Sequence, residues 1–296
     1  MAKRTKLRDV DGDGLNELLF DHRPADVALG GRLYCIDDDG RTVLWEFEHS
    51  PAGPDVWPHD DRIDRTFRGS STDWIQVWIE RDSENWLLVI SSHENLYPER
   101  VSLLRAHDGS IVSDYKHPGR FADYLLVDLD SDGEEELLLA GVNNPLPGLG
   151  HAALVALDLP FARRADVSTN YVGPENTLEL WYLLFPRARV FETQAEQTVA
   201  DAIRAYPDRL WLRLAQTAQD AYYLHIDRHA LEPIEVWSSD SYVTQHERLR
   251  KAGRFARPLT DDEIQWMGHY LVLPTAPDGN DPALTEQLAF RPLKSH

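Results

Sequence analysis

The sequence predicts an all-β protein built from repeated four-stranded units. Three observations support this fold class. The chain of 296 residues contains 9 Trp, 11 Tyr and 9 Phe, which favour half-buried sheet surfaces over helix. Short runs alternate between apolar and polar residues with a period of two, as in residues 42–48. A similar segment also recurs at a constant offset, which is typical of repeat architectures.

The recurring segment is short and rich in acidic residues. Residues 7–20 match residues 126–139 at an offset of 119 residues, with seven identities in the eleven positions from Asp9 to Leu19. The shared residues are Asp9, Asp11, Asp13, Gly14, Glu17, Leu18 and Leu19, which recur as Asp128, Asp130, Asp132, Gly133, Glu136, Leu137 and Leu138. So many identities without an insertion indicate a true internal repeat.

Strand-like runs and Asp-Gly turns extend this repeat into units of four strands. In the first unit, strands at 32–37 and 42–48 flank a turn at 38–40. The second unit predicts strands at 74–79, 86–91, 101–105 and 111–115, with a polar loop at 80–85. The third unit shows only three strands clearly, and the fourth is degenerate. The four units cover about 5–49, 74–117, 121–160 and 199–240.

Units of this size and strand content predict a β-propeller-like array over residues 1–240, because such blades stack face to face. Four units are few for a closed ring, so we expect further blades from 161–198, from the tail, or from sequence preceding residue 1. Residues 50–73 are interpreted as an insertion and 143–150 as a loop. The extension 241–296 is expected to be partly helical, at 245–251 and 260–267, with a capping box from Thr260 and Glu263.

Composition excludes several functional classes. The net charge of −20, from 50 acidic and 30 basic residues, repels a phosphate backbone, so we expect no nucleic-acid partner. No apolar run is long enough to span a membrane, and residues 1–6 lead into Asp9 without an apolar signal sequence. We therefore expect a soluble chain without a signal peptide, although its compartment stays open. The single cysteine, Cys35, lies in an apolar run and is expected to fill the core.

The acidic segments carry the spacing of a calcium loop. Alternating carboxylates in a tight, glycine-containing turn can converge on one centre, and Ca²⁺ prefers about 6–8 oxygen ligands. The first set is Asp9, Asp11, Asp13 and Glu17, with the backbone carbonyl of Leu15. The second set is Asp128, Asp130, Asp132 and Glu136, with the backbone carbonyl of Glu134. We predict two Ca²⁺ sites, one in each loop.

The acidic residues have other possible roles. An EF-hand is not favoured, because Phe20 and Leu139 stand where its bidentate glutamate is required. Asp side chains that only cap their own turn would need no metal. A third run at Glu80, Asp82 and Glu84 lacks the glycine, and residues 37–39 are interpreted as a hairpin turn.

The two DxDxDGxxE loops on a β repeat resemble the FG-GAP/VCBS family over most of residues 6–240. The resemblance implies a seven-bladed propeller with structural calcium, used for adhesion, ligand binding or sensing, at times beside catalytic or signalling domains. Residues 33–45 also resemble quinoprotein-type blades. The sequence departs from the family in having two intact loops, no signal peptide and a helical tail, which leaves blade number and export open.

No catalytic constellation stands out in the sequence. His93-Glu94, His107 and His117 lack HExxH spacing, residues 91–93 lack nucleophile-elbow glycines, and residues 148–150 do not form a phosphate loop. We therefore expect a non-catalytic module that binds a protein or a glycan. The alternatives are a propeller-based hydrolase or quinoprotein-like enzyme, with a polar cluster around His93 or His117, and a sensory domain of a longer signalling protein.

Most large aromatic residues are expected in the blade core, and exposed ones are candidates for stacking on sugars. The large aromatic residues in question are Trp74, Trp78, Trp86, Trp181, Tyr182, Trp211 and Trp237.

Overall fold

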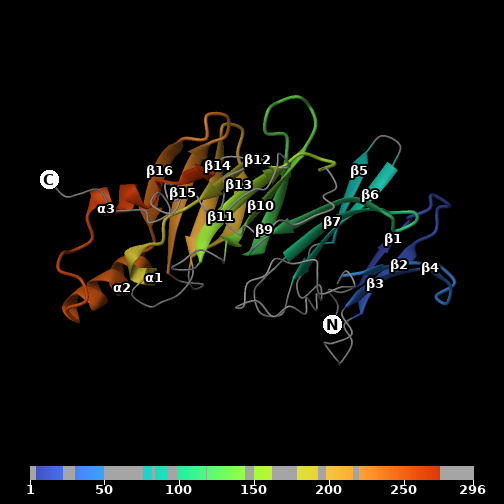
Figure 1. The fold of residues 1–296 in the computed structure, drawn as a ribbon, viewed down its shortest axis with the longest axis horizontal. Coiled ribbons are helices and arrows are strands. Elements are labelled where there is room, and N and C mark those ends of the chain that lie inside the picture. Colours follow the sequence, from blue (N-terminus) through green and yellow to red (C-terminus); the bar gives the residue numbers. More distant parts are fainter. Residues whose placement is uncertain are drawn as a thin grey trace, which may run out of the picture. The chain divides into compact units, whose positions relative to one another are not determined.

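The computed structural model describes residues 5–22, 31–49, 76–81, 84–92, 99–117, 119–143, 150–161, 179–192, 198–215 and 220–273. These ranges contain seventeen strands and three short helices, so the all-β prediction is confirmed (Figure 1). The chain divides into two compact units. Unit 1 comprises Met1–Pro118 and Pro160–Thr169, and unit 2 comprises Gly119–Leu159 and Asn170–His296. The segment 50–73, the residues His93 and Trp74, and most of the loop 143–150 lie outside the described residues.

Unit 1 contains two four-stranded antiparallel sheets whose strands pair in chain order. Sheet A consists of β1 (Thr5–Arg8), β2 (Glu17–His22), β3 (Arg32–Ile36) and β4 (Val43–Glu48), and sheet B of β5 (Gln76–Arg81), β6 (Glu84–Ser92), β7 (Glu99–Arg105) and β8 (Ile111–His117). The polar loop expected at 80–85 is shorter than predicted. Glu80 pairs with Asn85 and Arg81 with Glu84, so the strands continue into a tight hairpin despite their polar residues.

Sheets A and B bury one face of each against the other. Alternate residues of β2, β3 and β4 enter this core, including Leu19, Leu33 and Cys35, all with no exposed surface. The Nε1–H of Trp45 in β4 donates to the carbonyl of Ala106, 2.8 Å away at the end of β7, which joins the two sheets by a buried hydrogen bond. The prediction that Cys35 fills the core is confirmed.

Unit 2 also contains two sheets. Sheet C has the order β17-β12-β11-β10-β9, and sheet D has the order β13-β14-β15-β16. The strands of sheet C are β9 (Gly119–Val127), β10 (Glu136–Asn143), β11 (His151–Leu157), β12 (Glu179–Leu184) and β17 (Leu271–Leu273), and those of sheet D are β13 (Val199–Ala205), β14 (Arg209–Ala215), β15 (Ala221–Asp227) and β16 (Pro233–Ser238). Sheet C therefore takes its fourth strand from beyond residue 160 and a fifth from the C-terminal extension. Neither strand carries an Asp-Gly turn that would mark it in the sequence.

The described part of the C-terminal extension, residues 241–273, contains two helices, as expected, and it is also part of the core of unit 2. These helices are α2 (Asp240–Lys251) and α3 (Asp261–Trp266); a third helix, α1 (Arg189–Glu192), precedes sheet D in the chain. Helix α2 begins five residues earlier than predicted because the Ser239 hydroxyl accepts the Tyr242 backbone N–H. Thr260 caps α3 by accepting the Glu263 N–H at 3.3 Å. The Glu263 carboxylate, expected to complete the capping box, lies near Arg189 and His246 instead.

Sheets C and D share a second apolar core. Leu210, Leu212 and Leu214 of β14 alternate into it without any exposed surface, and Tyr242 of α2 and Met267 close it. The alternation places Trp211 of β14 on the opposite, half-buried face of sheet D, and Trp237 of β16 lies there too. These two residues are therefore exceptions to the expectation that most large aromatic residues lie in the blade core.

Among the described residues, no helix is both long enough and apolar enough to cross a membrane.

Candidate calcium loops

The first acidic segment, residues 9–17 (loop 1), connects β1 to β2. The pairing of Arg8 with Glu17 closes it. Inside the loop, the Asp9 carboxylate accepts the N–H groups of Gly12 and Gly14 at 2.7 and 3.1 Å. Asp11 accepts from Asp13 at 3.1 Å, and Asp13 from Leu15 at 2.7 Å. The carboxylates thus organise the turn by binding backbone donors.

The second acidic segment, residues 128–136 (loop 2), connects β9 to β10 and repeats this network. Asp128 accepts from Ser131 and Gly133 at 2.7 and 3.2 Å. Asp130 accepts from Asp132 at 3.2 Å, and Asp132 from Glu134 at 2.7 Å. Every donor and acceptor lies 119 residues beyond its counterpart in loop 1. The sequence repeat is therefore a repeat of backbone conformation as well.

Both loops bend through residues with positive φ. Gly12 and Gly14 have φ of +84° and +89°, and Gly133 has +95°. At the position equivalent to Gly12, loop 2 places Ser131 with φ of +66°, a region that disfavours a side chain. The conformation is kept in both loops although only one has glycine at this position.

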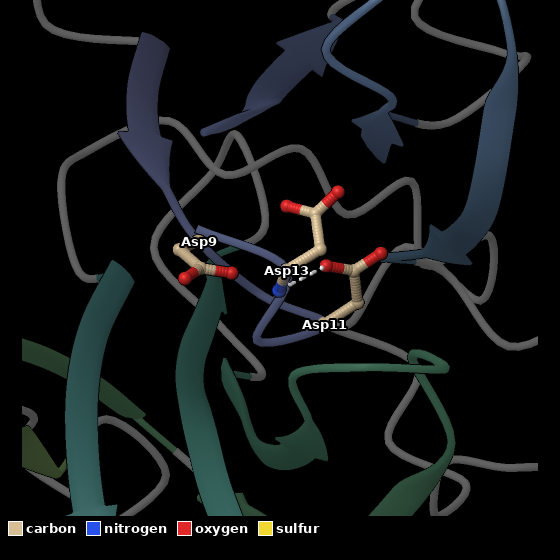
Figure 2. A group of neighbouring side chains, drawn as sticks. All are labelled: Asp9, Asp11 and Asp13. Atoms are coloured by element: carbon tan, nitrogen blue, oxygen red, sulfur yellow. Dashed lines mark hydrogen bonds between the residues drawn. The ribbon is translucent and has the colours of Figure 1, made fainter. Parts of the chain in front are cut away.

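In each loop, three carboxylates lie close enough together for one ion, and Figure 2 shows those of loop 1. In loop 1, oxygens of Asp9, Asp11 and Asp13 all lie within 4.8 Å of one another, and in loop 2 the same holds for Asp128, Asp130 and Glu136. Two oxygens that each lie 2.3–2.6 Å from a Ca²⁺ ion are at most about 5 Å apart, so both groups fit this cation. The donor chemistry, hard carboxylate oxygen, fits it as well.

A buried glutamate closes each loop. Glu17 Oε2 accepts the Val10 N–H at 2.6 Å, and Glu136 Oε2 accepts the Leu129 N–H at 2.5 Å. Burial raises the pKa of Glu136; the Leu129 N–H opposes this shift, and Asp130, Asp132 and Asp158 add to it. Loop 2 therefore holds negative charge in a region that disfavours it, which a bound cation would offset.

For four of the predicted ligands, the structure does not show a ligand atom that converges with the others. Glu17 and Asp132 fall outside the two close groups among the described residues. The N–H groups of Leu15 and Glu134 donate to Asp13 and Asp132, while ligation by their carbonyls stays a prediction.

Two other acidic segments are engaged elsewhere. Asp39 caps the β3–β4 turn by accepting the N–H groups of Arg41 and Thr42, as expected for a hairpin. Glu84, from the weaker third run, pairs with Arg105 at 2.5 Å and accepts the Trp86 indole N–H. Asp82 of that run lies outside the described residues.

A buried polar row between sheets A and B is not predicted from the sequence. His49 Nδ1 lies 2.8 Å from Ser91 Oγ, and His49 Nε2 lies 3.1 Å from Asp21 Oδ1. Because a carboxylate only accepts, Nε2 carries a proton. Arg100 donates to the Glu48 carbonyl at 3.2 Å, beside this row. The residues are 28 and 42 positions apart, so only the packing of the two sheets brings them together.

This row has the residue types of a hydrolytic triad, but it is buried between two sheets. Ser91 and His49 have no exposed surface, and Asp21 is 5% exposed. A substrate carbonyl cannot reach a fully buried hydroxyl. Of the candidate catalytic histidines, His107 is exposed beside Asp108 and His117 is buried against Tyr115. His93 lies outside the described residues.

No protein-family model matches this chain, and no curated protein matches it. Among solved structures, it is similar to a quinohemoprotein alcohol dehydrogenase from Pseudomonas putida HK5, with 12% identity, a TM-score of 0.41, and coverage of 78% of this chain and 45% of that one. It is also similar to an engineered GH43 glycoside hydrolase with endo-xylanase and exo-arabinofuranosidase activity, with 12% identity, a TM-score of 0.33, and coverage of 79% and 40%. The chain spans less than half the length of either protein, and similarity at this level assigns neither a family nor an activity.

Proposed function

We propose that this chain is a non-catalytic, calcium-binding β-propeller repeat protein of the FG-GAP/VCBS type that acts as a protein- or glycan-binding module. The observation that supports the proposal most strongly is the recurrence of five hydrogen bonds in loop 1 and loop 2. A turn that needed only a cap would not require three converging carboxylates, whose mutual repulsion opposes the fold.

A bound Ca²⁺ ion would offset the repulsion between the carboxylates of each loop. Asp9, Asp11 and Asp13 would hold one ion, and Asp128, Asp130 and Glu136 the other. The carboxylate oxygens that accept N–H groups keep a further lone pair, so capping and ligation are compatible. The bound ion would fix the connection between the first two strands of sheets A and C, and so preserve the array on which a partner docks.

Two observations support a binding role over catalysis. The Ser91–His49–Asp21 row is buried and lies between sheets, where it joins them. The acidic loops connect neighbouring strands, where a bound cation would neutralise their carboxylates and act structurally. A propeller-based enzyme remains the alternative, and reaction of Ser91 with a fluorophosphonate probe in the folded protein would favour it.

The test is calcium titration by calorimetry on chelator-stripped protein, with a melting curve with and without calcium. We expect two sites and a higher melting temperature in calcium. Asp11→Asn and Asp130→Asn should each remove one site. Asp39→Asn is the matched control, because Asp39 also caps a turn but lies outside both groups. Absence of heat together with unchanged melting would contradict the proposal.

A further inference from the structure

Two helices that follow sheet D in the chain cover part of the core of unit 2. Helix α3 contacts β16, and α2 contacts β15 and α1. Residues 240–267, which contain α2, α3 and their connection, are called the helical segment. Tyr242 and Met267 of this segment are buried in the core, and a Cβ at Gly268 would lie 2.3 Å from the Val236 side chain. The helical segment is therefore closely packed at both of its ends.

His246 of α2 lies inside this packing. Only 2% of its surface is exposed. Its ring stacks on Phe255 of the connection, with centroids 4.6 Å apart and planes inclined by 24°. Its Nε2 lies 3.8 Å from Oε1 of Glu263 on α3, a distance too long for a hydrogen bond. The imidazole is therefore held mainly by packing, and not by a hydrogen bond to this carboxylate.

The Glu263 carboxylate makes two long contacts with cationic or titratable groups. Nε of Arg189 on α1 lies 3.9 Å from Oε1, the same oxygen that faces His246. This oxygen is buried and accepts no hydrogen bond from the described residues. Three helices thus bring one carboxylate, one guanidinium and one imidazole together. Of these groups, the imidazole is the one whose charge ordinarily changes near neutral pH.

Two further charged groups act on His246 from its own helix. Glu247 and Arg250 of α2 pair with each other through two hydrogen bonds of 2.6 Å. Burial lowers the pKa of His246. The carboxylates of Glu263 and Glu247 oppose this shift, whereas the guanidinium groups of Arg189 and Arg250 add to it. A proton therefore binds the packed imidazole less readily than an exposed one, so protonation favours states in which the ring is exposed.

We propose that the helical segment is an acid-released cover of the core of unit 2, and that protonation of His246 releases it. Charging the ring would create a buried cation near Arg189, with its nearest carboxylate oxygen 3.8 Å away. Above about pH 6.5, the ordinary pKa of histidine, the ring is neutral and its packing is complete. As the pH falls below that value, this contribution to packing is lost. Release would uncover Met267 and, on the edge strand β16, Val236. This inference goes beyond the proposed binding function and does not depend on it.

The test is hydrogen exchange of the full chain in calcium at pH 7 and pH 5, expressed as protection factors so that the intrinsic pH dependence of exchange is removed. In the wild type, we expect a loss of protection at pH 5 that is larger in α2 and α3 than in β13–β15. His246→Phe, which keeps a ring against Phe255, should remove this excess loss. His269→Asn is the control, because His269 is exposed just beyond α3 and should leave the loss unchanged.

Two charge variants separate titration of His246 from a merely structural role. Glu263→Gln removes a charge that favours the protonated ring, so the loss of protection between pH 7 and pH 5 should exceed that of the wild type. Arg189→Gln removes a charge that disfavours the protonated ring, so the loss should be smaller. A structural role alone would change protection equally at both pH values.

Three results would overturn the inference: no excess loss in α2 and α3 of the wild type, an undiminished loss in His246→Phe, or shifts of the same sign in Glu263→Gln and Arg189→Gln. If His246→Phe does not fold, the two charge variants decide by themselves, because both keep the imidazole in place. Opposite shifts would then support release by protonation, and equal shifts would contradict it.

Discussion

At the scale of single residues, the two calcium loops reach one backbone conformation with different side chains. Gly12 adopts φ of +84° in loop 1, whereas Ser131 adopts +66° at the equivalent position of loop 2. A Cβ at Gly12 would meet nothing within 4 Å, so the cost of a side chain there is conformational. The loops therefore contain a natural comparison of glycine and serine in one setting.

Exchanging the two residues should shift stability in opposite directions. We expect Ser131→Gly to raise the free energy of unfolding by about 1 kcal/mol and Gly12→Ser to lower it by a similar amount. Chemical denaturation of both variants in calcium measures the effect. Changes of the same sign in the two loops would contradict the inferred equivalence.

The free energy of unfolding should depend on pH through His151. Its Nδ1–H donates to the Phe185 carbonyl at 3.1 Å, and burial, with Arg187 nearby, lowers its pKa to about 4. The folded pKa lies below the unfolded value, so the unfolded chain binds the extra proton first. This contribution to stability is complete above about pH 6.5 and disappears as the pH falls to about 4, for a loss of about 3 kcal/mol at most.

The variant His151→Asn should flatten this part of the pH dependence. Unfolding free energies of wild type and variant would be measured from pH 4 to pH 7, so that other titrating groups cancel in the difference. The difference should change most between pH 4 and pH 6.5. A constant difference across that range would show that His151 does not titrate in this way.

At the scale of elements, two hairpin turns share a glycine conformation and differ in their surroundings. Gly40 in the β3–β4 turn and Gly109 in the β7–β8 turn both have φ of +68°. A Cβ at Gly40 would meet open space, whereas one at Gly109 would lie 2.7 Å from the Trp45 ring. The second turn is therefore fitted to the residue that joins sheets A and B.

Alanine at these two glycines separates backbone strain from packing. We expect Gly40→Ala to cost about 1 kcal/mol, the cost of the left-handed conformation alone. Gly109→Ala should cost at least about 1 kcal/mol more, because Trp45 must move and its hydrogen bond to Ala106 weakens. Thermal unfolding of the two variants compares the costs, and equal losses would show that Trp45 relaxes freely.

Much of this element structure is predictable from sequence, for reasons that also explain what is missed. Strands of sheets A and D alternate between buried and partly exposed residues, as in β3 and β14, so their pattern is local. Strands β10 and β11 are buried on both faces, so their runs do not alternate. Strands β12 and β17 join sheet C from distant segments, and local sequence contains no record of that pairing.

The candidate site shows the same division. The three Asp positions of each loop follow from their spacing, because a tight turn brings alternate residues together. The Asp21–His49–Ser91 row depends on packing of two sheets and has no spacing signal. The position of Trp211 and Trp237 outside the core required the register of sheet D, since a half-buried face also selects aromatic residues.

At the scale of the whole molecule, the two calcium loops belong to different compact units. Loop 1 lies in unit 1 and loop 2 in unit 2. Loss of one ion should therefore act first on its own unit. In hydrogen exchange in calcium, we expect Asp11→Asn to speed exchange in β1–β8 and Asp130→Asn in β9–β16. Equal acceleration in both units by either variant would show one cooperative structure.

The single thiol, Cys35, can serve as a probe of how often unit 1 opens. Cys35 has no exposed surface, and burial, with Glu17, Asp11 and Asp37 nearby, raises its pKa to about 12. An alkylating reagent needs both contact and thiolate, so it can modify Cys35 only while sheets A and B are apart. Under native conditions, the rate of labelling would measure how often sheets A and B separate. With calcium added or withdrawn, the same rate would report how firmly loop 1 keeps unit 1 closed, without any engineered label.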